Sequence, residues 1–259
     1  MGVDMQGLSV SIGGTAIVHD VDLHIDDGER VGLVGASGSG KSMIAKAALG
    51  LLPLDARAQG AVRLGDTQVI GADERTLADL RGRYVGAVFQ NPGSSLNPVL
   101  RVIDQIELPL RLHYDLSAGE RRERAMAMLH KVGLDDALAR AWPHQLSGGQ
   151  QQRVGIATAL VTSPRCIIAD EPTTALDSIT QRQIVDLLVS LVDDAGAAML
   201  FITHDFAVLS RATTRCYVLD CGTMVDSGRT ADLLRHPGTP QTAALVEAAR
   251  ELTLRKEER

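Results

Sequence analysis

The chain is poor in aromatic residues and in cysteine, and it has neither a long apolar run nor an excess of basic residues. Of its 259 residues only 3% are Phe, Trp or Tyr, and three are cysteines. Three cysteines in apolar surroundings are too few for a disulfide framework, so a reducing compartment is expected. The absence of any run of about 18 apolar residues excludes a membrane-spanning helix, and no secretory signal is expected at the N-terminus. A net charge of −6 argues against a nucleic-acid-binding protein, which usually carries a basic stripe.

One glycine-rich stretch fits the pattern G-x-x-x-x-G-K-[ST]: Gly35, Ala36, Ser37, Gly38, Ser39, Gly40, Lys41 and Ser42. It follows an apolar run at 31–34 and precedes a segment with helical composition at 43–52, which is the context that a phosphate loop requires. Glycines let successive backbone N–H groups converge on an anion, and the helix N-terminus adds positive potential. Lys41 is expected to reach the β- and γ-phosphates, and the Ser42 hydroxyl to coordinate Mg²⁺. We therefore predict a nucleotide site rather than a turn that only caps a helix.

The order of the predicted elements indicates an α/β fold. Residues 1–30 alternate between apolar and polar and contain turn signals, which predicts short antiparallel strands. Farther along, apolar strands at 84–89, 166–169 and 199–203 alternate with helical segments, as in a parallel sheet. We predict a single domain over residues 1–259, with a P-loop NTPase core containing a parallel sheet and an N-terminal antiparallel β subdomain. The core covers about 1–97 and 164–259, and an inserted α-helical subdomain covers about 98–163.

Polar side chains that suit phosphate chemistry follow three of these strands. Asp170 is suited to hold Mg²⁺, directly or through water, and Glu171 to orient and deprotonate the attacking water. Gln90 ends another strand and could reach the metal or the same water. His204 could donate a hydrogen bond to the γ-phosphate, although a lone histidine after an apolar strand is more often structural. These assignments depend on the phosphate loop, without which an acidic pair before a proline indicates only a helix start.

A second candidate anion site is formed by Ser147, Gly148, Gly149 and Gln150, which follow Leu146 in the run LSGGQ. Two adjacent glycines before a helix, with a serine hydroxyl as donor, again place N–H groups where an anion can bind. A single chain does not need two γ-phosphate sites. Two chains arranged head-to-tail would use both, because each would close over the nucleotide of the other.

At this point the sequence resembles the ATP-binding cassette (ABC) family along essentially its whole length. GASGSGKS resembles the Walker A motif, CIIADE the Walker B motif with Glu171 as the catalytic glutamate, and LSGGQ the family signature. Gln90 matches the Q-loop, Ala175-Leu176-Asp177 the D-loop, and His204 the switch histidine. The resemblance implies an ATPase that converts ATP and water to ADP and phosphate, with ATP and Mg²⁺ bound. It places Asp177 among the nucleotide-site residues and Ser42, Gln90 and Asp170 near the metal.

Within the family, the stretches QNPGSSLNP and ADEPTTALD and the pair His236-Pro237 are similar to the peptide and nickel importer branch. That branch implies two membrane permease subunits, a second identical or different ATPase subunit, and an extracytoplasmic substrate-binding protein. It also implies a peripheral location at the cytoplasmic side of the membrane and no nucleic-acid partner.

Two departures from the family pattern affect these expectations. No aromatic residue precedes Tyr84, and Ile12 stands where members usually stack an aromatic ring on adenine, which predicts a weaker hold on the base. The cysteine-containing C-terminal extension of many peptide-importer ATPases is also missing, which favours nickel or metal-chelate importers slightly. The alternatives are a non-transport ABC ATPase, in a phosphonate-degrading assembly or linked to nucleic acid, a nucleotide-binding regulatory module, and an exporter.

Overall fold

The computed structural model describes residues 2–174 and 176–257 and divides the chain into two compact units. Unit 1 contains residues 1–77 and 198–259, and unit 2 contains residues 78–197. The predicted helical insertion, 98–163, lies inside unit 2, which also contains two strands. No helix within residues 2–174 and 176–257 is long and apolar enough to cross a membrane.

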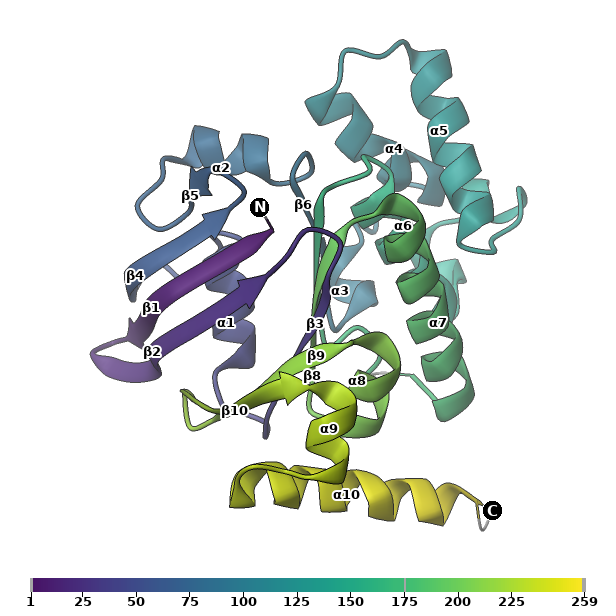
Figure 1. Ribbon diagram of the computed structural model, residues 1–259. Coiled ribbons are helices and arrows are strands. Elements are labelled where there is room, and N and C mark those ends of the chain that lie inside the picture. Colours follow the sequence, from purple (N-terminus) through teal and green to yellow (C-terminus); the bar gives the residue numbers. More distant parts are fainter. Residues whose placement is uncertain (1, 175, 258–259) are drawn as a thin grey trace. The chain divides into compact units, whose positions relative to one another are not determined.

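Unit 1 is built on two sets of strands (Figure 1). In chain order its elements are β1 (Val3–Ile12), β2 (Thr15–Ile25), β3 (Arg30–Val34), α1 (Lys41–Ala48), β4 (Ala56–Leu64), β5 (Thr67–Gln68), the start of α2 (Glu74–Leu80), β8 (Ala198–Thr203), α8 (Phe206–Ala212), β9 (Arg215–Asp220), β10 (Thr223–Arg229), α9 (Thr230–Arg235) and α10 (Pro240–Glu257). The first set is an antiparallel sheet in the order β2-β1-β4-β5. The predicted N-terminal antiparallel subdomain is therefore confirmed.

The second set of strands carries the buried core of unit 1. β3 lies between β8 and β9 and is parallel to both, while β10 is antiparallel to β9. All six residues of β8 are buried, as expected for a central strand that is covered on both faces. Val31, Leu33 and Val34 of β3 have no exposed surface. This explains why these strands appear in the sequence as continuous apolar runs rather than alternating ones.

Unit 2 combines a parallel strand pair with helices. Its elements are β6 (Val85–Val88), α3 (Pro92–Ser95), α4 (Val102–His113), α5 (Ala118–Lys131), 3₁₀ turns at Leu138–Arg140 and Pro143–Gln145, α6 (Gly148–Leu160), β7 (Cys166–Asp170) and α7 (Ser178–Ala195). β6 and β7 run parallel, with Val88 opposite Ala169. α5 turns Ala125 and Leu129 inward, whereas Arg121 on it forms an ion pair with Glu107 of α4. Apolar and charged residues thus lie on different faces of α5, as in an amphipathic helix.

The start of α7 differs from the sequence expectation. As a serine before a helical segment, Ser178 is a plausible N-cap. The structure instead has Asp177 as the capping residue, and its Oδ1 accepts hydrogen bonds from the N–H groups of Ile179 and Thr180 at 3.1 and 3.0 Å. Both serine and aspartate are good caps, so composition does not separate two such neighbours. The extended backbone of Asp177 (φ −65°, ψ 161°) decides it, because a cap residue lies outside the helical region.

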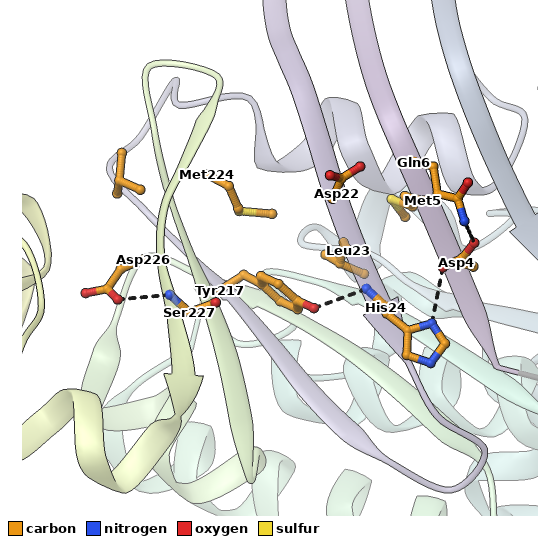
Figure 2. Close-up of a pocket in the computed structure, with 11 residues that line it drawn as sticks. Asp4, Met5, Gln6, Asp22, Leu23, His24, Tyr217, Met224, Asp226 and Ser227 are labelled. Atoms are coloured by element: carbon orange, nitrogen blue, oxygen red, sulfur yellow. Dashed lines mark hydrogen bonds and ion pairs between the residues drawn. The ribbon is translucent and has the colours of Figure 1, made fainter.

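In unit 1 a polar network joins the end of β2 to β9 (Figure 2). Arg215 Nε and Nη2 donate to the two oxygens of the Glu29 carboxylate at 2.8 and 2.7 Å, and the other terminal nitrogen, Nη1, donates to the Tyr217 hydroxyl at 2.7 Å. The Tyr217 hydroxyl accepts the His24 N–H at 3.2 Å. This bidentate pair lowers the pKa of Glu29 below its usual range. A cavity of about 490 Å³, lined by residues of β1, β2, β9 and β10, lies beside the network.

We expect His24 to make the stability of unit 1 depend on pH. Its ring nitrogens lie 3.1 Å from Asp26 Oδ1 and 3.2 Å from Asp4 Oδ1, and the hydrogen bond to Asp26, then that to Asp4, raises the pKa of His24. A raised folded-state pKa adds stability below about pH 6.5, which is lost as pH rises through the folded value. Between pH 6 and pH 8.5, we expect the free energy of unfolding to fall by about 0.2–1 kcal/mol more in wild type than in His24→Gln. This is the energy that exposed ion pairs typically contribute.

Urea unfolding of the two proteins at both pH values measures this difference, with His19→Gln on the same strand as the control. An equal pH dependence in wild type and His24→Gln would show that the ion pairs contribute nothing to folding.

Candidate functional site

The phosphate loop lies between β3 and α1, as predicted. Gly38 and Gly40 have φ values of +80° and +106°, a region that side-chain-bearing residues rarely enter. Gly40 occupies the N-cap position of α1, and no side chain caps that end of the helix. A Cβ on Gly38 would meet nothing within 4 Å, which leaves open space over the loop. This arrangement fits an anion.

Lys41 lies inside the loop that it is predicted to serve. Its side chain is 4% exposed, and its Nζ donates to the carbonyls of Gly35 and Ala36 at 2.9 Å each. A buried ammonium group needs such acceptors because desolvation of a charge is costly. Two carbonyl acceptors hold the charge at the centre of the loop, where a phosphate can accept a hydrogen bond from it.

The turn between β9 and β10 supports the phosphate loop from the side. The N–H of Gly222 donates to the Ser39 carbonyl at 2.9 Å. A Cβ on Gly35 would come within 2.1 Å of the Leu219 carbonyl oxygen and 2.8 Å of Ser39 Oγ, so only glycine fits at the first position. The buried Ser39 Oγ has no hydrogen-bond partner among the described atoms. The loop is therefore shaped by contacts that lie more than 180 residues away in sequence.

His204 leaves β8 at the same edge of the sheet as the phosphate loop. The parallel register pairs Val34 with Thr203, so the residues that follow both strands emerge side by side. His204 is exposed, and Asp205 after it caps α8 by accepting the N–H groups of Ala207 and Val208 at 2.8 and 3.3 Å. The cap fixes the point at which the chain turns away from the strand. The histidine is thus positioned at a carboxyl edge, where α/β folds bind ligands.

In unit 2, Gln90 and Glu171 also meet at a strand edge. They follow the parallel strands β6 and β7, and Gln90 Nε2 donates to Glu171 Oε2 at 3.3 Å. Glu171 has a φ of +47°, a left-handed conformation that costs roughly 1–2 kcal/mol for a residue other than glycine. Strain of this kind is concentrated at functional sites, where the surrounding structure imposes it.

The sequence did not predict one residue of this cluster, Thr174. Thr174 Oγ1 donates to the same Glu171 oxygen at 2.7 Å. The only signal available in sequence is a hydroxyl three residues after the glutamate, in a segment that also contains a proline. Such a spacing is common in turns and carries no information about which way the hydroxyl points.

Asp170 ends β7 and is half-buried. Among the described residues, no three His, Cys, Asp or Glu side chains gather so as to hold a metal ion by themselves. Mg²⁺ in phosphoryl-transfer proteins is usually held by one or two carboxylates together with substrate phosphates and water. Asp170 and Ser42 have oxygen ligands of the type that this ion prefers. The Gln90 amide nitrogen donates a hydrogen bond to Glu171, and its oxygen is the atom that suits a metal ion. The donor chemistry therefore fits Mg²⁺.

The LSGGQ segment starts α6 with a capping box. Ser147 Oγ accepts the Gln150 N–H at 3.3 Å, and Gln150 Oε1 accepts the Ser147 N–H at 2.9 Å. Capping uses an oxygen lone pair of Ser147, so its O–H remains the donor that the sequence assigns to it. A Cβ on Gly149 would lie 2.7 Å from Thr180 Cγ2, which shows how closely α6 approaches the start of α7.

Asp177 caps the N-terminus of α7. The D-loop resemblance also places it in the nucleotide site. Because its carboxylate accepts the N–H groups that start α7, the pKa of Asp177 is lowered, with the hydrogen bond from Thr180 as the main cause. Ala175 of the same motif lies outside the described residues. A role of Asp177 toward nucleotide stays a prediction.

Comparison with known proteins places these motifs in one family. The profile of the ABC transporter family matches residues 18–174, more than half of the chain. A putative peptide import ATP-binding protein of Brucella melitensis is 42% identical over 243 residues, which cover 89% of this chain and 71% of that protein. The probable D,D-dipeptide transport ATP-binding protein DdpD of Escherichia coli is 40% identical and covers 96% of this chain and 78% of its own length.

Solved structures agree with the sequence relatives. The ATP-binding cassette MJ0796, in a dimeric post-hydrolysis state with ADP and phosphate, superposes with a TM-score of 0.79 at 34% identity. The alignment covers 88% of this chain and 98% of that one. CbiO1 of Clostridium perfringens, part of a CbiONQ transporter complex, gives a TM-score of 0.79 at 25% identity, with 90% of each chain covered.

Proposed function

The chain belongs to the ABC transporter family and is an ATPase of that family, and from this premise we propose that it drives peptide import through separate permease subunits. The observation that carries the proposal is the 40–42% identity, over 89–96% of the chain, to proteins described as peptide or dipeptide transport ATP-binding proteins. The branch resemblance in the sequence also allows nickel or metal-chelate substrates. The names of the relatives favour peptides.

The side chains of the two units divide the proposed chemistry between them. In unit 1, the loop amides and Lys41 bind the phosphates and stabilise the charge that develops on the transferred group. His204 donates to the γ-phosphate and senses its loss. In unit 2, Glu171 accepts a proton from the attacking water, and Gln90 orients that water. Ser42, Asp170 and Gln90 would hold Mg²⁺, which would supply positive charge against the charge of the bound phosphates.

The presence of two helix N-termini with anion-binding character supports a dimer. One is the phosphate loop at the start of α1. The other is the segment of Ser147, Gly148 and Gly149 at the start of α6, in which Ser147 and Gly148 are exposed. We propose that two ATPase chains associate head-to-tail, so that the α6 terminus of each closes over the nucleotide of the other. Hydrolysis removes the γ-phosphate that both chains bind, and the dimer reopens. The partner is a second copy or a related chain.

The proposal places the protein at the cytoplasmic side of the membrane as a peripheral subunit. The test is to tag the chain in its own host, extract membranes with a mild detergent, and identify the co-purifying proteins. We expect two polytopic permeases and a second ATPase subunit to co-purify with the tagged chain. None of them should co-purify with an unrelated tagged ATPase from the same host. Recovery alone or with soluble enzymes only would favour the non-transport alternative.

The substrate class needs a second measurement on the same complex. After reconstitution in liposomes with the associated binding protein, we expect short peptides to stimulate ATP hydrolysis and a nickel–histidine chelate not to. Stimulation by the chelate alone would replace peptide import with metal import and leave the assignment as an importer intact.

A further inference from the structure

Glu171 is held by a residue of its own turn, and we propose that Thr174 is the positioning residue that orients the Glu171 carboxylate for catalysis. The inference rests on the proposed role of Glu171 as the base. It assigns to Thr174 a part in the reaction that the family motifs leave unassigned.

The geometry of the turn supports this role. Thr174 Oγ1 donates to Glu171 Oε2 at 2.7 Å, the length of a charge-assisted O–H···O⁻ hydrogen bond. The Thr174 N–H faces the Glu171 carbonyl at 3.4 Å, so the turn folds back on the glutamate through backbone and side chain together. A glutamate has three side-chain torsions, and without such hydrogen bonds a half-buried carboxylate can sample several rotamers.

The neighbouring residues keep this turn in place. Pro172 and Thr173 are buried, and the Thr173 hydroxyl accepts a hydrogen bond from Gln181 Nε2 of α7 at 3.3 Å. The two consecutive threonines thus have different tasks. Thr173 anchors the turn to α7, and Thr174 is exposed and directs its hydroxyl to Glu171.

The second donor to Glu171 differs in kind. Gln90 reaches Glu171 Oε2 at 3.3 Å from a separate loop, 81 residues away in sequence. The contact of Gln90 with Glu171 therefore depends on the position of that loop. Thr174 is three residues from Glu171 in the same turn, so its contact does not depend on the position of that loop.

The decisive variant is Thr174→Val, which keeps the shape of the side chain and removes the donor. Measured on the purified full chain, with whatever subunits co-purify with it, kcat for ATP hydrolysis is expected to fall about ten- to a hundredfold, as for a misplaced reacting group. KM for ATP and the thermal unfolding midpoint are expected to stay within about twofold and a few degrees of wild type. Thr174→Ser, which restores the hydroxyl, is expected to recover most of kcat.

Thr158→Val is the matched control, because it removes a threonine hydroxyl of α6 that donates to the Val154 carbonyl and belongs to neither the turn nor its anchor. It is expected to change kcat by less than about threefold. An unchanged or increased kcat in Thr174→Val, an effect on KM alone, or a loss in Thr174→Ser as large as in Thr174→Val would overturn the proposal. The readout is ATP hydrolysis and not transport, so a wrong importer assignment leaves the comparison valid.

Discussion

Replacing Glu171 by glutamine is expected to leave ATP binding intact and to lower the rate of ATP hydrolysis by about 10²–10⁴-fold, the contribution typical of a general base. Glutamine has the same shape as glutamate and can still accept the hydrogen bond from Thr174, so the strained turn at φ +47° is expected to persist. It cannot accept a proton from water. Phosphate release under saturating ATP measures the rate, and titration with a fluorescent ATP analogue measures binding.

The same variant tests the dimer. If hydrolysis reopens a head-to-tail dimer, Glu171→Gln with ATP and Mg²⁺ should elute from a sizing column at twice the mass of wild type with ADP. Glu123→Gln, on the exposed face of α5, is the control for the loss of one carboxylate and is expected to behave as wild type. Normal turnover by Glu171→Gln would remove Glu171 from the role of base. Slow turnover without a stable dimer would leave the base in place and contradict the closing scheme.

The local parts of the site could be predicted from sequence because short-range rules determine them. The strand, loop and helix around Lys41 follow one another within 20 residues, and the glycine spacing admits few other conformations. The register that places His204 beside the loop also follows from an α/β pattern, in which parallel strands end at one edge. The capping box at Ser147 and Gln150 was available from the same rules, since the spacing of a hydroxyl and an amide three residues later is its signature.

The contacts between distant segments could not be predicted. Gln90 and Glu171 are joined by a hydrogen bond across 81 residues, and nothing in either segment specifies the other's rotamer. The support of Gly35 by the Leu219 carbonyl depends on how closely β9 approaches β3, which is a property of sheet packing. The sequence also does not decide between two adjacent residues that can both cap a helix, such as Asp177 and Ser178 at the start of α7. Side-chain direction, rather than residue type, is what the sequence leaves open.

Replacing Lys41 by methionine is expected to weaken ATP binding about ten- to a hundredfold. The physical reason is the loss of a charge-assisted hydrogen bond to phosphate, which contributes about 1.5–3 kcal/mol. Methionine is unbranched and only one atom shorter than lysine, so at a position that is 4% exposed it limits the change in packing. Equilibrium titration with a fluorescent ATP analogue measures the loss. Hydrolysis at saturating ATP is expected to fall as well, because the same ammonium group faces the charge that develops in the transition state.

The variant also separates binding from folding. Without the ammonium group the carbonyls of Gly35 and Ala36 lose their donor, so the thermal unfolding midpoint has to be measured beside the affinity. Lys46→Met, on the exposed side of the same helix, controls for the loss of one positive charge and is expected to bind ATP as wild type does. If Lys41→Met binds ATP within about threefold of wild type, the loop amides hold the phosphates without help from the ammonium group, and the proposed role of Lys41 in binding is wrong. A weakened affinity at an unchanged midpoint assigns the charge to the nucleotide, because a lysine that only shaped the loop would lower both together.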